Sequence, residues 1–178
     1  LFYLNDGSGS RATTNNYNEA QRIISGSPYP TLMGGLTNTL AFYNFDFSFT
    51  FQGEWGSSLY NEGGKFQSGN ARYEDNQTLD QLDRWQNPGD ITMVPQARMY
   101  STNGQQSSTR YLEKSDFIRL RNLSFGYTFP KEITQKLSVD RLRLYFTGIN
   151  LLTFTDYSGY DPESSSDNFG NSNIEKGI

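Results

Sequence analysis

The sequence predicts an all-β fold whose antiparallel strands cross a membrane as part of a β-barrel wall. Three observations predict it: an aromatic row that alternates with a polar row, further strands with the same alternation, and connections that are short and long in turn. The low mean hydropathy of -0.70 fits this class, because barrel strands alternate and barrel loops are polar. No apolar run approaches the roughly 18 residues that a membrane helix needs.

The first long strand is expected over residues 32–42. It follows residues 1–30, which are rich in Asn, Gly, Ser and Thr. Residues 1–4 are a candidate for the tail of a strand, and the remainder is expected to form a loop. Leu36 and Leu40 share one face of the expected strand, and Asn38 interrupts that face. A very short turn then leads into the next strand, so the two strands are expected to form a hairpin.

The second strand, expected over residues 45–54, has one aromatic and one polar face, because alternate side chains of a strand point to opposite sides. The residues expected to face lipid are Phe45, Phe47, Phe49 and Phe51. The residues expected to face a watery lumen are Asp46, Ser48, Thr50 and Gln52. Lipid on one side and water on the other explain this pattern best. A soluble alternative stays open, in which the strand packs on a large core.

The third strand, expected over residues 116–129, changes parity part-way along. The residues of this strand expected to face lipid are Phe125, Tyr127 and Phe129. Ile118 and Leu120 fall on the opposite parity. Two interpretations are open: a β-bulge near Arg121, or outward-facing Arg119 and Arg121 that meet lipid phosphates. The bulge is the favoured interpretation.

The fourth strand is expected over residues 141–152, after a compact connector at 131–139. Arg141 and Arg143 fall on its polar side and are expected to face the lumen. Their charges either steer substrate or contact another part of the protein, or they form ion pairs along the wall with acidic residues such as Asp46. The ion-pair interpretation is favoured.

Residues 55–115 form a long polar connection, with a short helix expected around 80–86. Barrels place short turns on the periplasmic side and long loops outside, so this connection is expected to lie outside the cell. Loops on rigid scaffolds carry recognition, and aromatic rings stack on sugars or peptide side chains. The candidate contacts for ligand or partner are Tyr73, Trp85, Tyr100 and Tyr111. The favoured interpretation is that these rings pack the loop itself or meet a partner protein.

Composition excludes several function classes. The chain has no cysteine and no histidine, which removes thiolate and histidine metal sites and Ser-His-Asp catalysis. A net charge of -4 without a basic patch argues against nucleic-acid binding. Asp156, Asp161, Glu163 and Asp167 are oxygen ligands, but their spacing does not match a calcium loop. We therefore assign no catalytic residue, no cofactor and no metal, and expect no enzyme.

Several segments, in this order and spacing, resemble SusC/RagA-like TonB-dependent transporters, which are outer-membrane proteins of Bacteroidetes. Two blocks are the most specific when taken together: YLE at 111–113 with FIRLRNLSFGYTFP at 117–130, and NLLT at 150–153 with YSGYDPE at 157–163. Further matches are IISGSPYP at 23–30, GGLTN at 34–38, FDFS at 45–48 and Gly56 with YN at 60–61.

The resemblance implies that residues 1–178 are a partial C-terminal portion of a barrel of about 22 strands, without the plug and the terminal strand. It implies import of glycan or peptide fragments across the bacterial outer membrane together with a SusD-like surface lipoprotein. The implied partners are the remaining barrel and plug, TonB through an N-terminal part, and membrane lipid. A soluble all-β carbohydrate-binding module is the main alternative, and an adhesive surface protein is another.

Overall fold

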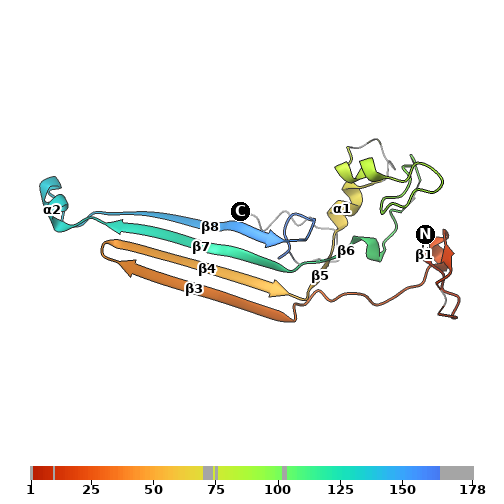
Figure 1. Cartoon of the computed structure of the whole chain (residues 1–178), viewed down its shortest axis with the longest axis horizontal. Helices are drawn as coiled ribbons and strands as arrows, with labels where there is room; N and C mark the ends of the chain where they lie inside the picture. The colour runs from red at the N-terminus through yellow and green to blue at the C-terminus, as the bar shows by residue number, and fades with distance from the viewer. Residues whose placement is uncertain (1, 10, 70–73, 75, 102–103, 165–178) are drawn as a thin grey trace. The chain divides into compact units, whose positions relative to one another are not determined.

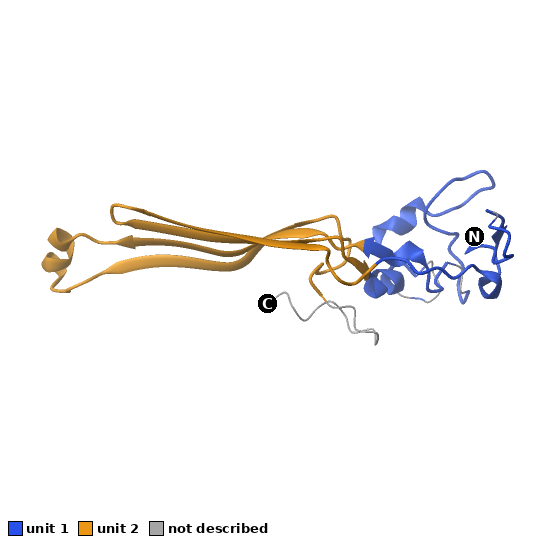
Figure 2. Ribbon diagram, turned by 90° about the horizontal axis from the view of Figure 1, so that it is seen from below, with its two compact units in different colours: residues 1–26, 60–113, 166–172 blue, residues 27–59, 114–165, 173–178 orange. Residues whose placement is uncertain are grey.

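The computed structural model describes residues 2–9, 11–69, 74, 76–101 and 104–164. These residues divide into two compact units, shown in different colours in Figure 2. Unit 1 contains the described residues of 1–26 and 60–113, and unit 2 contains those of 27–59 and 114–164. No helix in the described ranges is long and apolar enough to cross a membrane.

Unit 2 is built on a four-stranded antiparallel sheet in the order β3-β4-β7-β8 (Figure 1). Its strands are β3 (Leu32–Phe42), β4 (Phe45–Trp55), β7 (Phe117–Thr128) and β8 (Arg143–Thr155). They have 11, 11, 12 and 13 residues, so each is long enough for the roughly 9–11 residues of a tilted transmembrane strand. The predicted fold class and the first three strands are confirmed.

The connections alternate in length as the sequence predicted. Phe42 pairs with Phe45, so β3 and β4 are joined by a two-residue turn at Tyr43 and Asn44. Tyr43 has a φ of 51°, a left-handed conformation that only a minority of non-glycine residues adopt. The compact connector between β7 and β8 contains α2 (Lys131–Thr134) and a 3-10 helix (Gln135–Leu137).

The fourth strand differs from its predicted bounds. It begins at Arg143 instead of Arg141 and ends at Thr155 instead of Leu152. Arg141 therefore lies in the connector, where the alternation of a strand does not determine which way it faces. The backbone N–H of Phe129 still donates to the carbonyl of Leu142 (2.9 Å), which ties the end of the connector to the end of β7.

The predicted β-bulge in β7 is confirmed. Thr50 of β4 pairs with Asn122, and the next residue, Phe51, pairs with Leu120, so Arg121 is the extra residue. The register between β7 and β8 shifts at the same place. Arg119 pairs with Gln52 and therefore lies on the polar face. Because of the extra residue, Leu120 and Leu123 both lie on the apolar face.

Unit 1 consists of short elements. The strand β1 (Phe2–Tyr3) pairs with β2 (Thr13–Thr14), and the side chain of Asn61 caps α1 (Glu62–Gln67) by accepting from the N–H of Gly64 at 2.7 Å. The 3-10 helices of this unit are Tyr17–Glu19, Leu79–Asp83 and Thr109–Tyr111. The helix expected around 80–86 is thus a 3-10 helix. Two further short strands, β5 (Ser58–Tyr60) and β6 (Leu112–Lys114), have residues in both units and pair with each other.

Candidate functional site: the two faces of the sheet

Hydroxyl, amide and charged side chains gather on one face of the sheet, which we call the polar face. It contains Asp46, Ser48, Thr50 and Gln52 of β4, which alternate with the aromatic residues of that strand. Hydroxyls bond across neighbouring strands: Thr37 and Thr50 share a hydrogen bond of 3.1 Å, and Thr147 donates to Ser124 at 3.4 Å. Cross-strand pairs of this kind stabilise the sheet and leave a hydrophilic surface.

One ion pair on the polar face crosses a whole strand. Arg143 of β8 donates from Nη2 to Oδ2 of Asp46 on β4, at 2.6 Å. Gly126 of β7 lies between the two, paired with Asp46 on one side and with Tyr145 on the other. A Cβ at Gly126 would approach the Asp46 carboxylate to 2.6 Å and the guanidinium of Arg143 to 2.7 Å. The missing side chain of Gly126 is what lets the ion pair form.

Replacing Gly126 with valine is expected to displace the Asp46–Arg143 pair and to lower the free energy of unfolding by about 1–3 kcal/mol, the range for overpacking. Most of that loss is steric, because an exposed ion pair contributes only about 0–1 kcal/mol. Denaturant unfolding of the full-length protein in micelles measures it. Ser124→Val, on the same face of the same strand, is the control, and an equal effect of both changes would contradict this role of Gly126.

A second group of charges lies on the polar face, near the end of the sheet away from the two-residue turn. Arg119 of β7 is only 4% exposed. Its Nε donates to Thr153 Oγ1 at 2.9 Å, its Nη2 to Asp161 Oδ1 at 2.6 Å, and its Nη1 to Glu163 Oε2 at 2.9 Å. Asp161, which is 5% exposed, follows β8 in the chain, so this arginine joins three segments.

The extra residue of the bulge completes this group. Arg121 donates from Nε to Gln52 Oε1 at 2.8 Å and from Nη1 to Asn150 Oδ1 at 3.2 Å, and its Nη2 forms an ion pair with Glu163. Glu163 therefore bridges Arg119 and Arg121 with its two carboxylate oxygens. We call the group Arg119, Arg121, Asp161 and Glu163 the arginine–carboxylate cluster; its formal charges cancel.

The opposite, apolar face carries aromatic rings in van der Waals contact. Ring centroids are 5.7 Å apart between Phe47 and Phe49 and again between Phe49 and Phe51, and Phe45 lies 4.5 Å from Tyr127. Large apolar side chains remain exposed on this face, among them Leu36, Leu40, Phe42, Phe45, Phe125, Leu144 and Phe146. An exposed apolar surface of this extent is characteristic of contact with lipid or with another protein surface.

Known proteins resemble this chain in sequence and in fold. The chain is 36% identical over its whole length to TonB-dependent receptor P3 of Formosa agariphila, and 35% identical over 85% of its length to TonB-dependent receptor P26 of that organism. The structure of the RagAB peptide transporter superposes with a TM-score of 0.71 at 26% identity over 90% of this chain. The 'closed-closed' state of the RagAB peptide importer gives 0.70 at 27% identity over 88%. No family model matches the chain.

The chain is homologous to TonB-dependent receptors of the SusC/RagA type. It spans 17% of the length of receptor P3, 15% of receptor P26 and 18% of the RagAB transporter chain. The relatives are receptors and transporters, not enzymes. The four-stranded sheet therefore matches part of the β-barrel of RagA-like TonB-dependent transporters, as the sequence predicted.

Sequence reasoning missed the arginine–carboxylate cluster. Asp161 and Glu163 were considered only as calcium ligands, and the structure pairs both with arginines; Asp167 lies outside the described residues. In the part of the chain that the structure describes, no three His, Cys, Asp or Glu residues are gathered as a metal site. The available signal was two arginines at a predicted bulge and two carboxylates just beyond the next strand.

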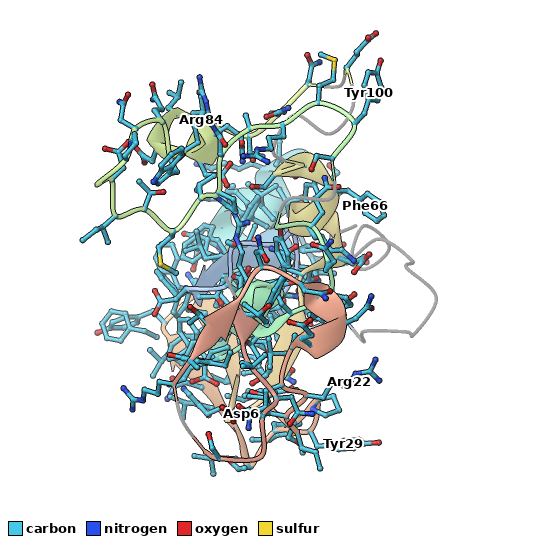
Figure 3. The ribbon with its side chains drawn as sticks, turned by 90° about the vertical axis from the view of Figure 1, so that its right-hand side faces the viewer. Asp6, Arg22, Tyr29, Phe66, Arg84 and Tyr100 are labelled. Carbon is cyan, nitrogen blue, oxygen red and sulfur yellow. The ribbon has the colours of Figure 1, made fainter. Side chains whose placement is uncertain are left out.

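The aromatic residues expected to contact ligand or partner in the long connection at 55–115 differ in exposure. Tyr100 is 72% exposed, projects outward (Figure 3), and donates to Glu74 Oε1 at 3.0 Å. Trp85 is half-buried, and its backbone N–H donates to the carbonyl of Val94 at 2.9 Å. Tyr111 is buried, and its hydroxyl donates to the carbonyl of Gly104 at 2.8 Å. Burial raises the pKa of the Tyr111 phenol, with Arg110 opposing the shift. Tyr73 lies outside the described residues.

Proposed function

We propose that this chain supplies four adjacent wall strands to the C-terminal part of an outer-membrane TonB-dependent transporter. The observation that carries the proposal is the separation of an aromatic from a polar face along β4, from Phe45 to Gln52. In this arrangement the aromatic face, which includes Phe47, meets lipid, and the polar face, with Ser48, lines the aqueous lumen. The sheet of a soluble module would need a second layer over its aromatic face, and no other described segment of unit 2 forms such a layer.

The lengths of the connections orient the wall. The two-residue turn at Tyr43 and Asn44 and the compact connector after β7 lie on the periplasmic side, because barrels keep their short turns there. The long connection between β4 and β7 then lies outside the cell, and the arginine–carboxylate cluster lies toward the outer end of the lumen.

The cargo in this proposal is a glycan or peptide fragment, taken up together with a SusD-like surface lipoprotein and energised by TonB through an N-terminal part of the protein. The similarity to a solved structure described as a peptide importer supports a peptide as the cargo. Among the aromatic residues, Tyr100 and Trp85 are the better candidates for cargo or partner contact. The burial of Tyr111 favours a packing role for that ring.

The facing of the wall can be tested with single cysteines in the full-length transporter, since this chain contributes no native cysteine. Phe47→Cys and Ser48→Cys place a label at neighbouring positions on opposite faces. A fluorophore at position 47 is expected to be quenched by brominated lipid, and one at position 48 by a water-soluble quencher. Phe146→Cys and Thr147→Cys repeat the comparison on β8. Equal quenching within both pairs would reject the proposed barrel orientation.

A fractionation experiment separates the transporter from the soluble carbohydrate-binding module. The polypeptide is expected in washed outer membranes, to need detergent for extraction, and to have a denatured mass several times the 20.3 kDa of this chain. A detergent-free soluble protein of about that mass which binds carbohydrate would support the module instead.

A further inference from the structure

The segment that follows β8, residues 156–164, is fastened to the polar face of the sheet by the arginine–carboxylate cluster. In Figure 1 it is the blue loop beyond the end of β8. We propose that Arg119 and Arg121 are positioning residues that hold this segment as an immobile strap on the barrel wall. The strap is then a fixed part of the pore lining at the outer end, although its position after a long strand is that of an outer loop.

The contacts of Arg119 carry the first step. Its Nε, Nη1 and Nη2 all donate, to Thr153 on β8 and to Asp161 and Glu163 on the strap. A guanidinium has a rigid planar fork of five donors, so simultaneous contacts in three directions fix its position. Both Arg119 and Asp161 are almost completely buried, so water does not compete for these bonds.

Arg121 adds a second attachment of the strap. The bulge gives this residue a place between Gln52 on β4 and Asn150 on β8, and both accept hydrogen bonds from it. Its remaining contact is with Glu163, the strap residue that Arg119 also holds. The strap is thereby joined to β4, β7 and β8, and moving it would require breaking several charged hydrogen bonds together.

The strap is also braced internally. Asp161 Oδ1 accepts from the N–H of Glu163 at 2.9 Å, and the hydroxyl of Ser164 donates to the carbonyl of Asp161 at 2.9 Å. Tyr157 is buried, and its N–H donates to Thr155 Oγ1 at 3.1 Å. The two carboxylates of the cluster therefore lie on a turn that has its own hydrogen bonds.

This inference rests on the proposed function for its meaning, because the polar face is the pore lining only in a barrel. In that setting the two arginines are neutralised by the protein's own carboxylates, so they offer no free positive charge to an anionic cargo. The strap holds the outer ends of β7 and β8 in a fixed position relative to each other. The movements that admit cargo then take place in other parts of the protein.

Spin labelling tests the strap in the full-length, detergent-solubilised protein. A nitroxide at Ser158→Cys, an exposed strap position, is expected to be immobile in the otherwise unchanged protein. With Asp161→Asn or Arg119→Gln added, its rotational correlation time is expected to fall several-fold. Glu163→Gln is the milder variant if either change prevents folding. Asp156→Asn, an exposed carboxylate of the same segment, is the matched control and should leave the label immobile.

A second label at Ser48→Cys reports whether the wall itself stays intact, and it is expected to keep its spectrum in every variant. A mobile Ser158 label in the unchanged protein, or one that is indifferent to the cluster variants while the Ser48 label is unchanged, would overturn the strap. Neither spectrum depends on transport. A failed uptake assay would therefore count against the proposed function and leave the strap standing.

Discussion

Replacing Phe47 with arginine is expected to block assembly of the barrel in the outer membrane. Phe47 is the third residue of β4, and its ring contacts that of Phe49 on the apolar face. A positive charge on the lipid side costs about 2–4 kcal/mol at the bilayer midplane and less toward the interfaces. The folded fraction of the full-length protein, read as the band that shifts on heating before electrophoresis, is expected to fall strongly.

The neighbouring change, Ser48→Arg, provides the matched control. It introduces the same side chain one residue further along the same strand, on the polar face, where Ser48 pairs with Ser124. The guanidinium stays hydrated there, so the folded fraction should remain close to that of the unchanged protein. If both variants assemble equally well, or equally badly, the assignment of the two faces is wrong.

Replacing Arg119 with methionine is expected to give the largest loss of stability among changes on the polar face. It leaves Asp161 buried without its main partner and removes one of the two arginines on Glu163. Removing one member of a buried ion pair typically costs about 3–5 kcal/mol, because the remaining charge is left uncompensated. Denaturant unfolding of the full-length protein in micelles measures the loss.

Arg143→Met is the comparison for that experiment, since its pair with Asp46 is considerably more exposed to solvent. Exposed pairs contribute about 0–1 kcal/mol, so this variant should unfold close to the unchanged protein. Adding Asp161→Leu to Arg119→Met should restore part of the stability, because the orphaned charge is then gone as well. A double variant less stable than Arg119→Met alone would contradict the charge argument.

The strands were predictable because side-chain alternation and turn length are local properties of the sequence. The bounds Leu32–Phe42 were predicted as they occur, since a two-residue turn and a strict alternation in the next strand leave little freedom of register. The bulge was predictable for the same reason: Leu120 and Leu123 cannot share a face without an extra residue between them.

What the sequence did not reveal depends on contacts between distant residues. Arg119 and Asp161 are separated by a whole strand and two connections, and nothing local indicates that they meet. Nothing in the sequence around Gly126 indicates that the Asp46–Arg143 pair passes over this residue. The start of β8 was placed at Arg141 because its alternation continues into the connector, where the backbone no longer follows it.

The bulge at Arg121 has a consequence for how strands of this kind tolerate insertions and deletions. Removing this single residue would restore an unbroken alternation and exchange one half of β7 between the apolar and the polar face. Either the arginine end or the Leu123–Phe125 end would then lie on the wrong face. A one-residue deletion at this position should therefore be far more damaging than one in the connector after β7. The side-chain alternation of β7 is thus set by Arg121, a residue without a register partner on β4 or β8.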